Sequence, residues 1–373
     1  MVGGSEGQGT CPCVPIKSIK MNKGVMIMKV KWGVIGAGGI ADRRTLPGMM
    51  LAENAELIAV LEVNMELAQK LKAKYNAKRA YDNVDDLLAD PEIEAVYIAS
   101  PVTYHKEQAI KAAKAKKHIL IEKPVAFTVA DGEEVAAICK KEGVLAAAGL
   151  MMRYHAYHQK MKEIVDSGKL GKVVSCRAQL TCWYPDMPGN WRQQKSTSGG
   201  GALMDMGVHC IDLIQYVTGA KAKKIAALNG TKTFKYEVED SSSVLFKMDN
   251  GAYAYVDSNF NIPDAAARCR FEIYGTKGSM LAEGTISQIE GGNLDVVLSD
   301  DSLAYDAKQD RVDVVPVKID VKFGNMYTKE IESFGKSILN NSTVEVPIED
   351  ALQVQKIIEA AYKSSDDDIF VNL

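Results

Sequence analysis

The sequence predicts an α/β domain with a parallel sheet, followed by an α+β domain whose large, open-faced sheet is mostly antiparallel. Three observations predict this architecture. Short apolar strands alternate with helices over residues 28–150, a pattern typical of a parallel sheet covered on both faces. Over residues 151–373, several strands follow one another without helices between them, which favours antiparallel pairing. A glycine-rich turn also joins the first strand to the first helix.

The segment before the first domain, residues 1–27, shows no apolar periodicity. It mixes Gly, Ser and Lys with isolated apolar residues, and Met21, Met26 and Met28 offer alternative start sites. We therefore expect a loosely held N-terminal extension that is not part of either domain.

The first domain is expected to alternate five strands with four helices. Apolar runs of four to seven residues between turns indicate the strands, and a longer period near 3.6 indicates the helices. Pro47 interrupts the first helix. The strands are expected at residues 30–35, 56–61, 95–99, 118–121 and 145–149, and the helices at residues 40–52, 64–75, 104–115 and 128–141.

In the second domain, we expect helices near the beginning and at the end of the segment, and most of the strands between them. Asn250-Gly251 between two strands predicts a tight hairpin turn. The strands are expected at residues 173–181, 242–248, 252–259 and 270–274, and the helices at residues 156–167, 202–217, 327–339 and 349–363.

The composition excludes several classes of protein. The 373 residues carry a net charge of −3, which argues against a nucleic-acid partner. The longest strongly apolar run, residues 143–152, is far shorter than the ~20 residues that span a bilayer. Seven scattered cysteines form no disulfide framework and suggest reduced thiols, so we expect a cytoplasmic protein without a membrane partner.

The glycine-rich turn has the GxGxxA spacing of a dinucleotide-binding turn. Gly36 permits a tight turn, and Gly38 permits close approach of a pyrophosphate. Gly39 and Ile40 lead into a helix whose N-terminus favours negative charge, and Ala41 permits close packing of helix and strand.

Glu62 ends the second strand, where a carboxylate accepts hydrogen bonds from the adenosine ribose hydroxyls. Its negative charge opposes a 2′-phosphate, and no Arg follows it directly. The sequence therefore predicts NAD rather than NADP as the cofactor.

Two further segments carry groups suited to proton transfer. Lys123, between Glu122 and Pro124, ends a strand at the edge where open α/β sheets bind ligands. In a predicted helix, Asp205 and His209 are i, i+4 neighbours, with Asp212 one turn further along the same side. Burying an acid and an imidazole on an apolar helix is unfavourable unless they have partners, so we expect either a functional use or a hydrogen-bonded core histidine.

Together these segments resemble the glucose–fructose oxidoreductase, inositol dehydrogenase and rhizopine-catabolism (Gfo/Idh/MocA) family, over nearly all of residues 28–373. The matching motifs are Ala99-Ser100-Pro101 with His105 beyond it, Lys117-His118 before Glu122-Lys123-Pro124, Arg153-Tyr154-His155, Gly168-Lys169-Leu170-Gly171, the spaced residues Gly201, Leu203, Asp205, Gly207, His209 and Asp212, Glu349-Asp350-Ala351 and Ala360-Ala361-Tyr362.

The resemblance implies a Rossmann domain that binds NAD and a second domain whose sheet often joins copies into dimers or tetramers. It implies a catalytic set of Lys123, Asp205 and His209. It also adds residues to the cofactor site, namely Ser100, Pro101, His105, Glu122 and Lys123 itself. One departure stands out, because Val102 replaces the Asn that usually follows the Ser/Thr-Pro pair and helps to position the cofactor.

The resemblance implies reversible oxidation of a secondary hydroxyl on a small-molecule sugar, glycoside or inositol. We expect His209 to be the base, because an ordinary histidine pKa of ~6.5 suits proton transfer near neutrality. Lys123 would stabilise the developing alkoxide, and Asp205 would orient the hydroxyl. The residues expected to contact substrate are Arg153, Trp183, Tyr184, Trp191, Arg192, Asp205 and His209.

Among subfamilies the sequence looks closest to sugar and glycoside 3-dehydrogenases, so glucoside 3-oxidation is the leading prediction. Inositol 2-dehydrogenation is one alternative, and a glycoside hydrolase or lyase that oxidises its substrate transiently with NAD is another. A non-catalytic NAD-binding regulator is least favoured, because a sensor does not need the Lys123, Asp205 and His209 set. No metal is expected, since no carboxylate or thiol completes a site beside His155 and His158.

Overall fold

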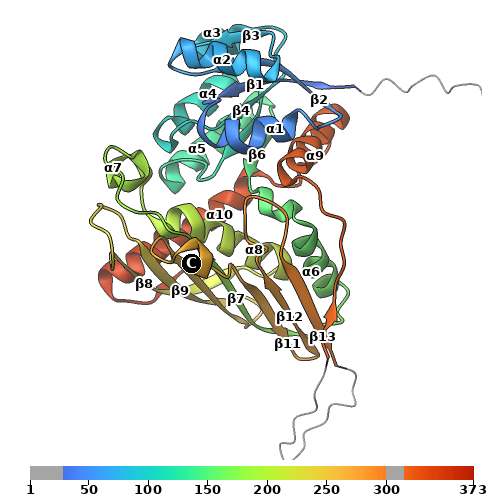
Figure 1. Ribbon diagram of the computed structural model, residues 1–373, viewed down its shortest axis with the longest axis vertical. Helices are drawn as coiled ribbons and strands as arrows, with labels where there is room; N and C mark the ends of the chain where they lie inside the picture. Colours follow the sequence, from blue (N-terminus) through green and yellow to red (C-terminus); the bar gives the residue numbers. More distant parts are fainter. Residues whose placement is uncertain (1–27, 300–314) are drawn as a thin grey trace, which may run out of the picture.

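The protein is described by a computed structural model over residues 28–299 and 315–373, so the extension expected at residues 1–27 lies outside the described part. Two sheets form two layers along the long axis, the first at the top of Figure 1 and the second at the bottom. None of the helices in the described ranges is both long and apolar enough to cross a bilayer.

The first sheet has six parallel strands in the order β3-β2-β1-β4-β5-β6. The predicted parallel sheet is confirmed, and the order reverses between β1 and β4, where such sheets bind ligands. The sequence analysis missed β3, whose three residues are only half-buried. The strands are β1 (Val30–Ile35), β2 (Ala55–Leu61), β3 (Arg79–Tyr81), β4 (Ala95–Ile98), β5 (His118–Glu122) and β6 (Ala146–Gly149).

Helices cover both faces of this sheet. The first begins as a π-helical turn, η1 (Ala41–Thr45), and continues as the short α1 (Leu46–Met49), with Pro47 in its first turn. Side-chain hydrogen bonds cap the N-termini of α2 (Met65–Tyr75) and α5 (Val129–Glu142). Asn64 accepts from the Leu67 amide, and Thr128 accepts from the Asp131 amide. The remaining helices are the unpredicted α3 (Val84–Ala89) and α4 (His105–Lys114).

The second sheet has nine strands in the order β14-β13-β12-β11-β7-β10-β9-β8-β15. Every neighbouring pair is antiparallel except β7 and β10, which are parallel. The Asn250-Gly251 turn is confirmed, with Gly251 at φ +89°. The strands are β7 (Val173–Thr181), β8 (Ala222–Gly230), β9 (Ser241–Met248), β10 (Tyr253–Asn259), β11 (Phe271–Gly275), β12 (Gly278–Glu283), β13 (Asn293–Leu298), β14 (Val317–Lys318) and β15 (Val371–Asn372).

Three helices cover one face of the second sheet: α6 (Ala156–Asp166), α8 (Val208–Thr218) and α10 (Ile348–Asp367). The opposite face is open. One cross-strand row on it consists of Leu281, Glu272, Arg177, Tyr255 and Leu245. Leu245 is 46% exposed and Leu281 is 39% exposed, so apolar side chains reach the surface on this face.

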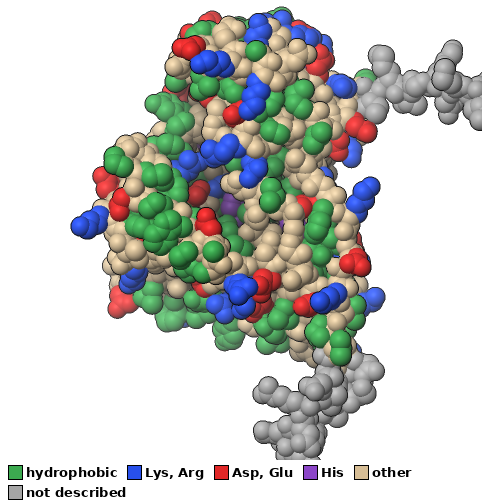
Figure 2. All heavy atoms as spheres, viewed as in Figure 1, with side chains coloured by type: hydrophobic (Ala, Val, Ile, Leu, Met, Phe, Trp, Pro, Cys, Tyr) green, Lys and Arg blue, Asp and Glu red, His purple; other side chains and the backbone are tan. Residues whose placement is uncertain are grey.

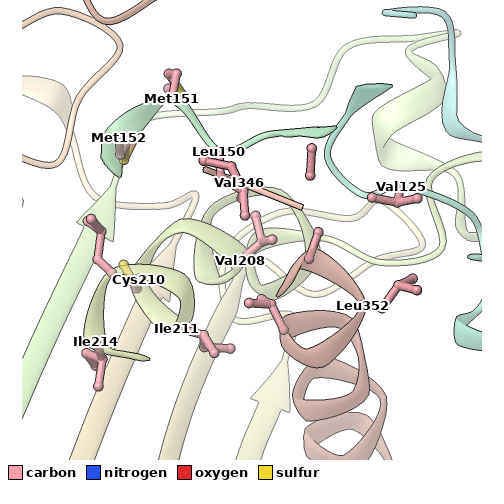
Figure 3. Close-up of a cluster of buried hydrophobic side chains, with 14 of the residues drawn as sticks. Val125, Leu150, Met151, Met152, Val208, Cys210, Ile211, Ile214, Val346 and Leu352 are labelled. Atoms are coloured by element: carbon pink, nitrogen blue, oxygen red, sulfur yellow. The ribbon is translucent and has the colours of Figure 1, made fainter. Parts of the chain in front are cut away.

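The two layers share a buried core. Leu150 and Met151, just after β6, lie in one cluster with Val208 and Ile211 of α8 and with Leu352 of α10 (Figure 3). The cluster fixes the helix that carries His209 against the end of the first sheet.

Helix α9 (Met326–Asn340) follows the second sheet in the chain but packs on the first one. Its Phe334 ring lies 6.0 Å from that of Trp32 in β1, and Ile331 belongs to the same buried cluster. The Ala148 amide of β6 also donates to the Val346 carbonyl. A division of the chain into residues 28–150 and 151–373 therefore assigns α9, which packs on the first sheet, to the second domain.

Candidate active site

The glycine-rich turn adopts a backbone that needs glycine at two positions. Gly36 has φ +74°, and an added Cβ would lie 2.6 Å from the Ser100 amide nitrogen. Gly39 has φ +56° and open space around it. The turn thus brings the ends of β1 and β4 together and leaves room in front of the first helix.

Glu62 lies beside the turn at the end of β2. The Gly38 amide donates to Glu62 Oε1 at 2.5 Å, and a Cβ on Gly38 would stand 2.9 Å from the same oxygen. The turn therefore holds the carboxylate at the switch point of the sheet.

The segment after β4 has a different architecture from the one expected. Ser100 donates to Gln108 Oε1 at 2.6 Å, and Val102 is buried at the start of a 3-10 turn. His105 is 1% exposed, and its two ring nitrogens contact the carbonyl oxygens of Ser100 at 2.8 Å and Pro124 at 2.9 Å. His105 thus joins two loops, and its contact with the cofactor stays a prediction from the sequence.

Glu122 ends β5 and accepts a short hydrogen bond from the Tyr97 hydroxyl. Thr45 donates to the same hydroxyl oxygen at 2.9 Å. Burial raises the pKa of Glu122, although the Tyr97 hydrogen bond and the Lys123 charge oppose this shift.

Glu330 of α9 is 2% exposed, and neither of its carboxylate oxygens has a partner within the described residues. Burial, together with the nearby Glu122, raises the pKa of Glu330 well above its ordinary value.

Lys123 and Asp205 form an ion pair between the two layers. Lys123 Nζ lies 2.8 Å from Asp205 Oδ1 and donates to the Asp205 carbonyl oxygen at 2.7 Å. Burial alone would raise the pKa of Asp205, but the charges of Lys123 and Arg192 outweigh it and lower this pKa. The Asp205 side chain is 39% exposed and that of Lys123 is 13% exposed, so the pair borders open space.

Asp205 lies in a π-helical turn, η5 (Leu203–Gly207), which leads into α8. Glu239 holds the start of this turn, because its carboxylate accepts from the Gly201 amide at 3.0 Å and the Leu203 amide at 2.9 Å. Tyr362 donates to the same carboxylate at 2.9 Å. The wider turn was not expected from the sequence, which predicted one regular helix over residues 202–217.

His209 is buried close to the ion pair. It is 6% exposed, and its Nδ1 has no hydrogen-bond partner within the described residues. Burial, together with the Lys123 charge, lowers the pKa of His209 to about 3. The expectation of a pKa near neutrality is therefore wrong for this state of the protein, and His209 is neutral at physiological pH.

Arg153 and Asp212 lie away from this pair. Arg153 Nη2 is 2.5 Å from Asp212 Oδ1, and Arg153 Nη1 is 2.7 Å from Asp350 Oδ2. Both Arg153 and Asp212 are buried. Asp212 and Asp350 pair with Arg153, so the assignment of Arg153 to the substrate site stays a prediction from the sequence.

The loop after β7 supplies aromatic groups beside the pair. Trp183 is 44% exposed, and the Tyr184 hydroxyl accepts from Asn190 Nδ2 at 2.8 Å. The Arg192 guanidinium lies 4.4 Å from the centre of the Trp191 ring, and its charge lowers the pKa of Asp205 and opposes the rise at Glu122. The four loop residues predicted to contact substrate thus lie in one region: Trp183, Tyr184, Trp191 and Arg192. The charge of Arg192 also acts on Asp205 of the ion pair.

The surface is hollowed between the two layers. Figure 2 shows Lys and Arg side chains on the upper rim of the hollow and a histidine at its floor. Within the described ranges, no three His, Cys, Asp or Glu side chains are arranged to hold a metal ion.

Models of known protein families match residues in both layers of the protein. The model of the "Oxidoreductase family, NAD-binding Rossmann fold" matches residues 30–150, and that of the "GFO/IDH/MocA C-terminal domain" matches residues 158–281. The chain belongs to the GFO/IDH/MocA family. It is therefore an oxidoreductase with an NAD-binding Rossmann domain, as the sequence predicted.

Relatives within the GFO/IDH/MocA family are distant but extensive. The myo-inositol 2-dehydrogenase of Thermotoga maritima is 27% identical over 346 residues, which cover 91% of this chain and 98% of that one. The 1,5-anhydro-D-fructose reductase of Ensifer adhaerens is 27% identical over 69% of this chain and 77% of its own. The aldose-aldose oxidoreductase of Caulobacter crescentus, solved with glycerol, has a TM-score of 0.83 at 25% identity and covers 92% of this chain and 100% of its own.

The residues of this GFO/IDH/MocA chain fit NAD. Gly36 and Gly39 provide a cradle that a Cβ would fill or strain, and Glu62 is fixed beside it. Glu122 ends β5 at the same edge of the sheet, and Lys123 follows it. Sequence reasoning missed the positioning roles of Tyr97 and Glu239, and no motif marked either residue.

Proposed function

We propose that this protein reversibly oxidises a secondary hydroxyl of a sugar, glycoside or inositol with NAD, and that glucoside 3-oxidation is its leading activity. The observation that carries the proposal is the Lys123–Asp205 ion pair, at 2.8 Å, between the cofactor-binding layer and the second layer. A pair of proton-bearing and charge-stabilising groups beside a nicotinamide site is what alcohol oxidation requires.

The roles follow from the environment of each side chain. Bound NAD supplies the acceptor of the hydride, or its donor in the reverse direction. Lys123, held by Asp205, donates a hydrogen bond to the substrate oxygen and stabilises negative charge there. Neutral His209 has an unpartnered ring nitrogen and accepts the hydroxyl proton.

The names of the relatives support a polyol substrate. They include a myo-inositol 2-dehydrogenase and a 1,5-anhydro-D-fructose reductase, which differ in substrate but share chemistry at a sugar or cyclitol carbon. The exposed ring of Trp183 and the guanidinium of Arg192 suit a sugar, since aromatic faces pack on C–H surfaces and Arg donates to hydroxyls. Inositol 2-dehydrogenation is the second candidate, because the inositol enzyme aligns over 91% of this chain.

The test measures NADH formation with a panel of sugars, methyl and aryl glucosides and inositols. We expect oxidation of at least one glucoside, and a Lys123→Met variant should lose about 10²–10⁴-fold in turnover. NADH binding, followed by fluorescence, should persist in this variant. Lys114→Met, on the exposed side of α4, is the matched control and should keep full activity.

Three results would change the proposal. Full turnover in Lys123→Met would remove Lys123 from the catalytic set. Release of free aglycone by the purified enzyme and NAD would indicate a glycoside hydrolase or lyase with transient oxidation. NADH binding without turnover across the whole panel would indicate a non-catalytic regulator.

We also propose that copies of the chain associate through the open face of the second sheet, where Leu245 and Tyr253 are exposed. Such a face would bury apolar area in a dimer or larger oligomer. The cytoplasmic location expected from the cysteines stays a prediction.

A further inference from the structure

Aromatic side chains from two separate loops meet beside the catalytic turn. The Trp183 and Phe234 rings contact edge to face, with centroids 5.1 Å apart, and the Phe234 and Tyr236 rings stack at 5.5 Å. Trp183 is 44% exposed, whereas Phe234 and Tyr236 are half-buried. We call Trp183, Phe234 and Tyr236 the aromatic platform.

The platform is held in place by the backbone. Asp240 accepts from the amides of Lys232 at 2.8 Å, Thr233 at 2.8 Å and Phe234 at 3.0 Å, which fixes the loop between β8 and β9. The Tyr236 hydroxyl donates to the Tyr184 carbonyl at 3.2 Å, which joins this loop to the one after β7. The rings are therefore pre-positioned, and binding would order few side chains.

The platform is continuous with the catalytic turn. Tyr184, next to Trp183, packs on Phe260 with ring centroids 4.9 Å apart. Phe260 lies in a buried cluster with Ala202 and Met206, which flank Asp205 in the chain. A substrate whose hydroxyl meets Lys123 and Asp205 would extend toward these rings, on the side of the hollow where Figure 2 shows hydrophobic side chains gathered.

The buried carboxylate of the platform loop, Asp240, is already engaged. Its two oxygens accept from three amides of its own loop and from the side chains of Ser241 and Asn261. Asp264 and Asp186 each accept one backbone amide, from Trp183 at 2.9 Å and from Lys235 at 3.1 Å. The hydroxyls of a second sugar ring would therefore find no free oxygen on Asp240, whereas a planar apolar group needs only the ring faces.

We infer that the aromatic platform binds the aglycone of a glycoside, and that this aglycone is aromatic or similarly planar. The inference rests on the proposed function, since it names the substrate class of the same site. It makes Trp183 and Phe234 specificity residues that act on the non-reacting part of the substrate.

The experiment compares 4-nitrophenyl glucoside with methyl glucoside. Phe234→Leu keeps the apolar side chain but removes the ring. We expect this variant to lose about 10-fold or more in kcat/KM for the aryl glucoside, and less than about 2-fold for the methyl glucoside. Phe370→Leu, a 62% exposed ring elsewhere on the surface, is the control and should change neither value.

An equal loss with both glucosides, or no loss with either, would overturn the inference. If the wild-type enzyme oxidises neither glucoside, glucoside oxidation is removed as the leading activity, but calorimetry of 4-nitrophenyl glucoside binding still decides the platform. Binding to the wild type that weakens about 10-fold in Phe234→Leu would uphold it, and absence of wild-type binding would reject it.

Discussion

Two side chains in the site have pKa values below their ordinary ones. His209 is buried without a hydrogen-bond partner in the described residues, and its pKa is lowered to about 3. Asp205 keeps its charge because Lys123 is 2.8 Å away. At the scale of single residues, the site therefore consists of a fixed ion pair and a neutral imidazole across the physiological range.

The pH dependence of catalysis follows from this ionisation. Because the folded-state pKa of about 3 lies below the ordinary value of ~6.5, His209 already carries no proton at pH 5. We expect kcat/KM to show no inflection from this histidine between pH 5 and 8. His209→Asn should lower kcat by about 10²–10⁴-fold at every pH in that interval, without changing the shape of the profile.

The measurement is a pH series of initial rates for the two proteins. His118→Asn is a suitable control, because His118 lies half-buried at the start of β5, outside the site. A wild-type inflection near pH 6.5 that disappears in His209→Asn would contradict the prediction, because kcat/KM reports the pKa of His209 before substrate binds.

At the scale of the element, the π-helical turn η5 depends on a close backbone contact. A Cβ on Gly201 would lie 2.0 Å from the Glu239 carbonyl oxygen, so any larger residue must displace the backbone that Glu239 holds. The position of Asp205 therefore depends on two separate segments. One contains Gly201, just before η5, and the other contains Glu239, just before β9.

Gly201→Ala should destabilise the protein by about 3 kcal/mol and lower turnover, because the displaced turn moves Asp205 away from Lys123. Gly143→Ala is the matched control. Gly143 has φ +71° but open space for a Cβ, so it should cost only about 1 kcal/mol. Urea unfolding measures both values, and equal losses in the two variants would show that the Glu239 contact does not matter.

The elements also show what a sequence can and cannot indicate. The periodicity of apolar residues predicted most strands and helices of residues 28–150, and the GxGxxA spacing predicted the glycine-rich turn. The parallel pairing of β7 with β10 was not predictable, because adjacency along the chain says little about which strands pair across a crossover. The ion pairs of Arg153 were not predictable for a similar reason, since one of its partners, Asp350, lies 197 residues away. A π-helical turn has no sequence signal of its own.

At the scale of the whole molecule, the second sheet has one face that no helix of the described residues covers. Its central row combines apolar and charged side chains, with Arg177 lying over the Tyr255 ring at 5.5 Å and Leu245 beside it. This is the face through which we propose that identical chains associate.

The double variant Leu245→Lys/Leu281→Lys should convert the proposed oligomer to monomers, because like charges would meet across the interface. Light scattering after size-exclusion chromatography gives the mass directly. Leu51→Lys, at a 66% exposed position in the first layer, should leave the mass unchanged. A wild-type protein of monomer mass would disprove association through this face.

Helix α9 has a consequence for how the molecule is made. Residues of η1, α1 and α2 cover part of the Trp32 face of the first sheet, and the rest lacks its cover until residues 326–340 have been synthesised, nearly at the end of the chain. The cofactor-binding layer therefore lacks part of its core while most of the second sheet is being synthesised. A fragment that stops at residue 150 would carry every strand of the first sheet but not the helix that completes its core, so the gene cannot be divided at the apparent boundary between its halves.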